Sequence, residues 1–358
     1  MRRKTSSTIW AIVCTILLIG GEVASFFFAW QTGTWTAMAQ LGGFVVGLIL
    51  APIFHELGHI IFAKSQDMQI VYAKFSFLKL REKQGKLSFA LASPFGADET
   101  QAIPRCGGNM QKRARLYTVG GLIFGGIWLG IIALISISLV LFVGGVGSYA
   151  VLGLLPYGAY LFLLNVLPCE YGSGKTDMLV YRGLKNNEPA ESTMVSAMEI
   201  QGRLYAGESY AEIDETLYFD VAQLPEDEPL FAVMLDLRYR YYLDKGDMKN
   251  AADCLNRLVN AQAYLTEGET EKIAAELVYM HVLNGDMERA TACGKGCASY
   301  LQSNTVSAKR ILTAVAVAGG KAEEAEILKN QAKTLLNKEK IIGEKRFEER
   351  LLSRLHLA

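Results

Sequence analysis

The chain has no net charge and few charged residues, which narrows the classes of protein it can belong to. Its 358 residues include 36 basic and 36 acidic side chains, and only 20% of all residues are charged. Because basic residues do not outnumber acidic ones, the chain is not expected to bind nucleic acid through a net positive charge. Hydrophobic residues make up 51% of the chain, so a largely disordered protein is also excluded.

The two halves of the chain differ in the charge that they carry. Residues 1–178 hold 14 Lys and Arg against 8 Asp and Glu (+6), whereas residues 179–358 hold 22 against 28 (−6). The first half contains long apolar runs, and the second half has the pattern of ordinary soluble helices. We therefore expect a membrane segment followed by a water-soluble segment.

Four apolar stretches are long enough to cross a bilayer as helices, which takes about 20 residues. They cover residues 9–30, 41–63, 117–143 and 149–167. Basic residues precede the first stretch, as in a signal peptide. That stretch is too long for a signal peptide, however, and no small-residue cleavage pattern follows it. We interpret it as a membrane anchor.

Basic residues in the connecting segments predict the orientation of these stretches. Residues 31–40 and 144–148 are expected to be uncharged loops, whereas the N-terminus has three basic residues and the loop 64–116 has ten. Because basic loops stay in the cytoplasm, we place both termini and the long loop there. Five of the six cysteines fall at or beyond that side, where disulfides are not expected. Cys293 and Cys297, one helical turn apart, are interpreted as core residues.

The second apolar stretch contains the run His55-Glu56-Leu57-Gly58-His59. Histidines at i and i+4 share one face of a helix and can hold one metal ion, and the adjacent Glu can take a proton from water. Burying such polar side chains in the hydrocarbon of a membrane costs free energy, so their presence indicates a function. The alternative is a buried polar cluster that fixes helix packing. His59 lies about 7–8 Å from the cytoplasmic end of the helix, within reach of water.

A zinc site with two histidines lacks one protein ligand, because a catalytic site keeps a further position open. His281 and His356 lie far along in the soluble half, and we interpret both as structural or surface residues. Two carboxylates, Glu170 and Asp177, closely follow the fourth apolar stretch. Either can complete the site.

These features together resemble the site-2 protease family of intramembrane zinc metalloproteases. The resemblance covers roughly residues 41–180 and depends on the HELGH motif, a β-rich loop, a Gly-rich third stretch, and Asn165-Val166-Leu167-Pro168 followed by Asp177. Carried over by position, it implies that His55, His59 and Asp177 bind zinc and that Glu56 is the catalytic base.

Two departures from the family pattern keep alternatives open. Asp177 lies nine residues after Pro168 instead of five and is followed by Met178 instead of Gly, so Glu170 remains a rival ligand. The resemblance also implies that Asn165 faces the site, where it would donate a hydrogen bond to the substrate or to the developing oxyanion. A role in helix packing is the alternative for Asn165.

The third apolar stretch lacks the Pro and Asn that often follow its first glycines in the family. It keeps five glycines that we expect to pack against the HELGH helix, since such spacing lets helices approach closely in lipid. They are Gly120, Gly121, Gly125, Gly126 and Gly130.

The long loop is rich in residues that favour strands. Residues 68–80 and 86–93 predict a β-hairpin with its turn at 81–85. At the cytoplasmic mouth of the site, such a hairpin would hold an unwound substrate by strand addition. Alternatively, it lies on the membrane surface.

The soluble half shows a weak internal repeat. Glycines 207, 246, 285 and 320 are spaced by 39, 39 and 35 residues, and Ala251, Ala290 and Ala325 follow the last three at one offset. This pattern indicates a short tetratricopeptide-like solenoid with a surface for a protein partner or a substrate tail. A plain helical bundle is the alternative.

The sequence thus predicts an α-helical polytopic membrane protein with four spans and a site-2 protease core that carries a small β-hairpin insertion. An all-α, tetratricopeptide-like cytoplasmic domain follows. The segments are 1–40 (anchor span and loop), 41–180 (protease core, with the β-rich loop 65–116) and 187–358 (repeat domain).

The predicted activity is that of a Zn²⁺ metalloendopeptidase in the plasma membrane. It would cut membrane-protein or peptide substrates in or next to transmembrane segments, near the cytoplasmic face. One alternative is a non-catalytic membrane adaptor that recruits partners through its repeat domain. Another is a membrane metalloprotease of a different class, with Glu as the third ligand and a site that faces the cytosol.

Overall fold

The structure is a computed structural model. It describes residues 2–83, 86–93, 98–171, 174–226, 228–260 and 266–355. It is mostly helical, with 74% of residues in helices. The chain divides into two compact units. The first unit comprises Met1–Ile103 and Gln111–Glu191, and the second comprises Pro104–Met110 and Ser192–Ala358.

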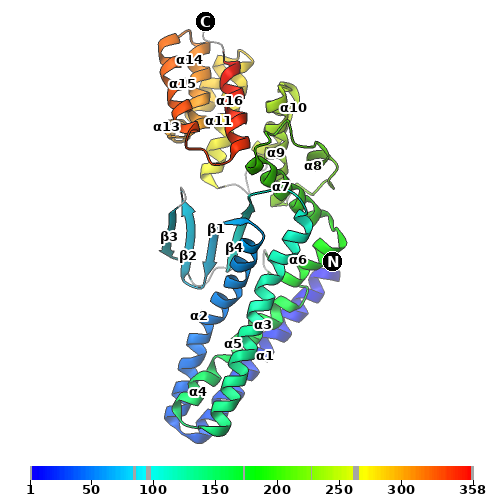
Figure 1. Cartoon of the computed structure of the whole chain (residues 1–358), viewed down its shortest axis with the longest axis vertical. Helices are drawn as coiled ribbons and strands as arrows, with labels where there is room; N and C mark the ends of the chain where they lie inside the picture. Colours follow the sequence, from blue (N-terminus) through cyan, green and yellow to red (C-terminus); the bar gives the residue numbers. More distant parts are fainter. Residues whose placement is uncertain are drawn as a thin grey trace. The chain divides into compact units, whose positions relative to one another are not determined.

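The first unit contains four helical segments that are long and apolar enough to cross a membrane (Figure 1). They are Ser7–Thr32 within α1 (Arg2–Thr32), α2 (Thr34–Ser65), α3 (Met110–Phe142), and Val146–Val166, which joins α4 (Val146–Gly153) to α5 (Leu155–Val166). This confirms the prediction of four apolar helices of membrane-spanning length and indicates that the protein associates with a membrane.

The turns between these helices are shorter than the sequence suggested. Most of residues 31–40 are helical, and only Gly33, with φ 143°, separates α1 from α2. The expected loop 144–148 shrinks to Gly144 and Gly145, both with positive φ. The fourth stretch breaks at Leu154, because Pro156 has no N–H to continue the helical hydrogen bonds.

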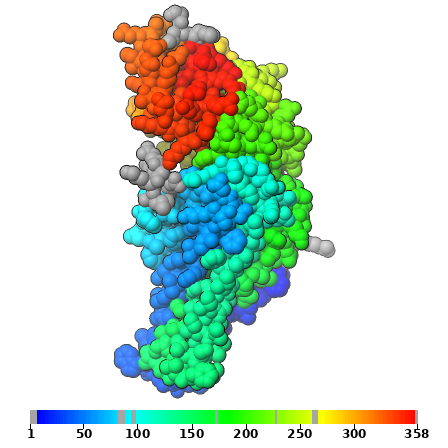
Figure 2. Space-filling view, viewed as in Figure 1, coloured from blue at the N-terminus to red at the C-terminus, as the bar shows by residue number. Residues whose placement is uncertain are grey.

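Glycines allow α2 to touch its neighbours at two levels. Near one end of the bundle, a methyl group at Gly43 would lie 2.8 Å from the Ala150 carbonyl carbon in α4. At the level of the HELGH motif, a methyl group at Gly58 would lie 2.7 Å from the Gly120 carbonyl carbon in α3. Figure 2 shows the α1–α2 and α3–α4 turns gathered at one end of this bundle. The close approach at Gly58 brings α3 against the histidines.

A four-stranded sheet follows α2, with strand order β3-β2-β1-β4. The strands are β1 (Met68–Phe75), β2 (Leu78–Lys83), β3 (Lys86–Leu91) and β4 (Glu99–Pro104). The antiparallel register pairs Tyr72 with Arg81 and Leu80 with Phe89. β1 packs against α2, and β4 lies at the edge next to β1.

The predicted two-stranded hairpin is therefore smaller than the four-stranded sheet of the structure. The segment 68–80 is split by a turn at Ser76, which has φ 56°. The expected turn at 81–85 is strand as far as Lys83, and residues 84 and 85 lie outside the described part of the chain. Strand β4 was missed because its six residues, ETQAIP, show little of the apolar alternation that marks a strand.

After α5, the chain makes a short hairpin of β5 (Glu170–Tyr171) and β6 (Gly174–Lys175) and enters α6 (Asp177–Asn186). The fully buried Thr176 fastens this loop. Its hydroxyl donates to the Leu167 carbonyl at 2.6 Å and accepts from the Cys169 N–H at 3.0 Å. Asp177 thus begins α6 from a fixed position.

From Ser192 onward, the described residues of the second unit form helices joined by turns and loops. Its elements follow α7 (Pro189–Ala206), which begins in the first unit: α8 (Thr216–Phe219), α9 (Pro229–Lys245), α10 (Met248–Asn260), α11 (Glu267–Leu283), α12 (Met287–Lys295), α13 (Ala298–Gln302), α14 (Val306–Ala318), α15 (Ala322–Leu336) and α16 (Ile342–Arg354). The pairs α9–α10, α11–α12 and α14–α15 pack as helix hairpins.

The sequence repeat coincides with these hairpins. Gly246, Gly285 and Gly320 lie at the turn of each hairpin with φ between 71° and 83°, a conformation that side chains disfavour. The three predicted alanines are buried in the second helix of each pair. Small residues at that position let the two helices close on each other.

A buried ion cluster lies in the core of the second unit. Arg310 is 1% exposed and donates to Glu348 and to Glu276, each at 2.7 Å. Its guanidinium also lies 4.2 Å from the centre of the Tyr279 ring. Because buried charges are tolerated only when they are paired, this cluster ties α11, α14 and α16 together.

Candidate metal centre and active site

Helix α2 presents the three polar residues of the HELGH motif on one buried face. His55, Glu56 and His59 are each at most 7% exposed. The two imidazole centres lie 5.0 Å apart with their planes nearly perpendicular. The 3.6-residue period of the helix produces this pairing, as the sequence suggested.

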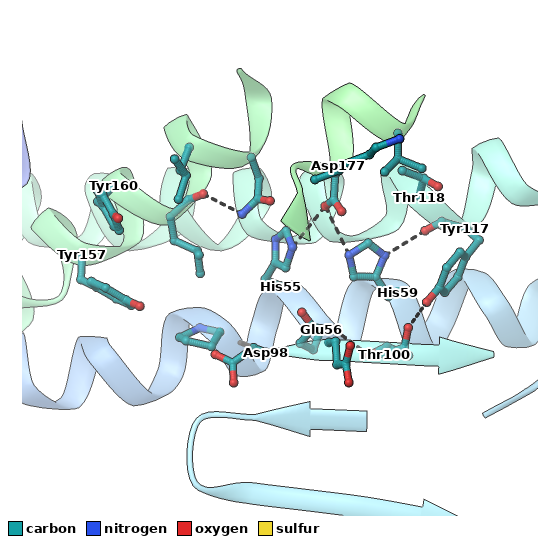
Figure 3. A pocket seen from close by; sticks show the side chains of 17 residues that line it. His55, Glu56, His59, Asp98, Thr100, Tyr117, Thr118, Tyr157, Tyr160 and Asp177 are labelled. Carbon is teal, nitrogen blue, oxygen red and sulfur yellow. Dashed lines mark hydrogen bonds and ion pairs between the residues drawn. The ribbon is translucent and has the colours of Figure 1, made fainter. Parts of the chain in front are cut away.

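Asp177 completes a cluster of three possible metal ligands. Its Oδ2 lies 3.2 Å from His55 Nε2 and 3.3 Å from His59 Nε2 (Figure 3). Among the described residues, this is the one group of three or more His, Cys, Asp or Glu side chains placed to hold a metal ion. The two histidines come from α2 and the aspartate from α6, 118 residues after His59 in the chain.

The spacing of the three ligand atoms fits zinc. Ligands at about 2.0–2.1 Å from a tetrahedral zinc ion stand about 3.3 Å apart, as the two nitrogen–oxygen distances do here. Asp177 Oδ2 is fully buried and makes no hydrogen bond of ordinary geometry. A buried carboxylate oxygen that faces two imidazoles without hydrogen-bonding them is suited to share a cation with them.

The imidazole of His59 is held in the orientation that a metal ligand requires. Its Nδ1 lies 3.0 Å from the backbone carbonyl of Tyr117 in α3. Since a carbonyl only accepts, Nδ1 carries a proton, and Nε2, on the side of Asp177, is the nitrogen that can bind a metal ion. Such a second hydrogen bond is the usual support of a metal-binding histidine.

The negative charge of Asp177 suits a metal ligand. Burial alone would raise the pKa of its carboxyl group, but the two neighbouring imidazoles hold that pKa well below its usual range. Asp177 is therefore an anion at neutral pH. Anionic carboxylate and neutral imidazole are the forms that bind metals.

Glu56 lies beside the three ligands and has a partner from the sheet. Its Oε2 accepts a hydrogen bond of 2.6 Å from the hydroxyl of Thr100 in β4. Both residues line a cavity of about 410 Å³ together with the histidines and Asp177. Tyr157 and Tyr160 of α5 line the same cavity (Figure 3).

Asn165 also lines this cavity and is 6% exposed. Its Nδ2 donates to the Leu161 carbonyl of the same helix at 3.1 Å, which uses one of its two N–H groups. The structure therefore brings Asn165 to the site that the sequence indicated. Its hydrogen bond within α5 is compatible with a packing role and leaves a second N–H for another acceptor.

Glu170, the rival ligand, lies elsewhere in the first unit. It belongs to β5, and its backbone N–H donates to the Ser7 hydroxyl of α1 at 2.9 Å. It belongs neither to the ligand cluster nor to the lining of the cavity. His281 lies in the last turn of α11, in the second unit, and His356 falls outside the described residues.

The glycines of α3 have separate tasks. Gly120 and Gly121 pack against α2, as predicted, and a methyl group at Gly121 would lie 2.8 Å from His55 Nε2. Gly126 instead faces Phe162 of α5, and among the described residues no neighbouring element lies within 4 Å of the methyl position of Gly130. The GxxxG spacing alone does not distinguish these environments.

Sequence reasoning missed two residues of the site, Thr100 and Tyr117. Thr100 comes from a strand that was not predicted, and Tyr117 appeared only as the start of an apolar stretch. No local pattern marks either residue, because each reaches the site through tertiary packing.

A scan against protein-family models and searches of curated proteins and of solved structures found no match to the chain.

Proposed function

We propose that this protein is an intramembrane zinc metalloendopeptidase of the site-2 protease type. One observation carries the proposal. The HELGH motif lies in a helix of membrane-spanning length, and a distant aspartate meets both of its imidazoles at ligand spacing. Two histidines and one carboxylate form the donor set of a catalytic zinc site, and a neighbouring glutamate can serve as its base.

Each residue of the site has a role in peptide hydrolysis. His55, His59 and Asp177 would hold the zinc ion, which when bound supplies Lewis acidity toward the scissile carbonyl and lowers the pKa of water. Glu56 takes a proton from the attacking water and passes it to the leaving amine. The second N–H of Asn165 can donate to the developing oxyanion.

The position of the motif suggests where substrates are cut. His59 lies six residues before the end of α2, after which β1 begins. Because the basic loop of the sheet favours the cytoplasm, the site would lie in the cytoplasmic leaflet with both termini on that side. Membrane proteins and peptides with segments at that depth are the proposed substrates, and the plasma membrane is the proposed location.

The second unit is proposed to be a tetratricopeptide-like domain. Three helix hairpins with a glycine at each turn and an alanine at each helix contact support this assignment. Such arrays bind protein segments on a concave surface, so this unit would recruit a partner or a substrate tail.

Zinc content of the detergent-purified protein tests the proposal. We expect about one zinc ion per chain in the wild type, in Glu56→Ala and in Glu170→Ala, because none of these removes a ligand. His55→Ala and Asp177→Ala should lose the metal. If zinc is lost instead with Glu170→Ala, the metalloprotease with a Glu ligand is the better description.

A cleavage assay separates an enzyme from a metal-binding scaffold. Fluorescein-labelled casein should be cut by the zinc-loaded wild type and left intact by Glu56→Ala with the same zinc content. A folded wild type without zinc would refute the protease and favour the membrane adaptor.

A further inference from the structure

The cytoplasmic sheet reaches the proposed base of the active site through a single side chain. Strand β4 is the edge strand next to β1, and it lines the cavity with Glu99 and Thr100. The Thr100 hydroxyl donates to Glu56 Oε2 at 2.6 Å, a short distance typical of a hydroxyl bound to a carboxylate. The two residues are 44 positions apart in the sequence.

Thr100 is itself held by the residue that supports a metal ligand. The Tyr117 hydroxyl donates to the backbone carbonyl of Thr100. The backbone carbonyl of Tyr117 accepts from His59 Nδ1, and the two rings lie 5.3 Å apart. Three separate hydrogen bonds therefore link His59 to Tyr117, Tyr117 to Thr100, and Thr100 to Glu56 (Figure 3).

This arrangement limits the freedom of Glu56. A glutamate side chain has three rotatable bonds, and only a few of its rotamers place the carboxylate beside the ligand cluster. A threonine hydroxyl has one proton to donate, and here it goes to Oε2. Oε2 keeps a second lone pair and Oε1 keeps its own, so the oriented carboxylate can still take a proton from water.

We propose that Thr100 is a positioning residue that orients Glu56 as the general base. The inference rests on the proposed peptidase function. Through Thr100, the sheet would help to orient the catalytic base, in addition to any role in binding substrate. Because side chains alternate along a strand, Thr100 keeps this contact only while β4 holds its present register.

The test compares Thr100→Val, which keeps the shape and removes the hydroxyl, with Thr100→Ser, which keeps the hydroxyl. Ser88→Ala is the matched control, since Ser88 lies in the same sheet and its hydroxyl donates to the Arg81 carbonyl, away from the residues that line the cavity. Zinc per chain and the kcat and KM for fluorescein-labelled casein are measured for each variant in detergent.

We expect Thr100→Val to lower kcat by about tenfold or more, since a misplaced base loses part of the general-base rate gain. KM should change less than twofold, and zinc per chain should stay at the wild-type value. Thr100→Ser should restore most of kcat, and Ser88→Ala should match the wild type.

An equilibrium measurement gives a second readout that does not depend on turnover. Acetohydroxamate loses a proton when it chelates a metal, and a base beside the metal favours that loss. Titration of the Co²⁺-loaded protein, followed by its visible absorption, should show affinity about tenfold weaker in Thr100→Val and in Glu56→Ala.

Three results would overturn the inference while the peptidase function stands. They are wild-type kcat in Thr100→Val, loss of zinc from Thr100→Val, and failure of Thr100→Ser to restore activity. A wild type that binds zinc but cuts neither casein nor a detergent-solubilised peptide with a transmembrane segment would instead overturn the proposed function, and this inference with it.

Discussion

Replacing Gly121 by alanine should weaken binding of the proposed zinc ion, because α3 passes directly over the two histidines. The added methyl group would lie 2.8 Å from His55 Nε2 and closer still to His59 Nε2. Carbon atoms normally keep about 3.5 Å from such neighbours, so α3 or the rings must move by roughly 0.7–1 Å. Metal ligands tolerate displacements of only about 0.2 Å.

The expected loss follows from that mismatch. Disturbing the support of a metal ligand typically costs 10–100-fold in affinity, and here both histidines are affected. We expect zinc to bind about 100-fold more weakly, which corresponds to ~2.7 kcal/mol. Competition with a chelating dye measures the Kd of the detergent-purified protein.

Two other glycines of α3 form a graded control. A methyl group at Gly125 would lie 3.5 Å from His55 Nδ1, an ordinary contact, and one at Gly130 would meet nothing within 4 Å. Gly125→Ala should change the zinc Kd less than threefold, and Gly130→Ala should leave it unchanged. Equal zinc affinity in Gly121→Ala and Gly130→Ala would refute the packing of α3 on the histidines.

Further predictions concern residues outside the ligand cluster. Arg310→Ala should lower the free energy of unfolding by about 3–5 kcal/mol, because two buried carboxylates lose their partner. In denaturant titrations, the exposed ion pair of Arg257 is the control, worth less than about 1 kcal/mol. Burial raises the pKa of Cys297 to about 11 from 9.0, so its thiol should resist iodoacetamide at pH 8. The folded state then binds the extra proton, and stability should fall as pH rises from about 9 to 11; rapid alkylation of the native protein would contradict this. Asn165→Ala should keep zinc and lower kcat for casein about tenfold if Asn165 binds the oxyanion, whereas unchanged kcat with lower stability would assign it to packing.

Several features of the structure could be predicted because they depend on local chemistry. Helices of membrane-spanning length follow from composition, since a bilayer requires about 20 apolar residues. The pairing of His55 with His59 follows from the helical period alone. The hairpin turns of the second unit follow from the spacing of its glycines, because positive φ is cheap only for that residue.

Helix ends and strand pairing were harder to predict from the sequence. The segment 31–40 has no charge and no proline, and its one glycine, Gly33, is a weak sign of a helix end because glycine is also common inside membrane helices. Strand β4 is short and polar, and its place beside β1 depends on contacts with residues some 30 positions earlier in the chain. Such pairing is decided by the sheet and not by the segment itself.

The amino-acid sequence by itself determined that this protein has apolar helices, two histidines on one helical face and a glutamate beside them. It favoured Asp177 as the third ligand with Glu170 as a rival, and it gave no sign of Thr100 or Tyr117. The tertiary structure decided among them: α6 places Asp177 against both imidazoles, and β4 and α3 bring Thr100 and Tyr117 to the same cavity. Local periodicity can align residues within one element, but only packing brings together side chains that belong to different elements.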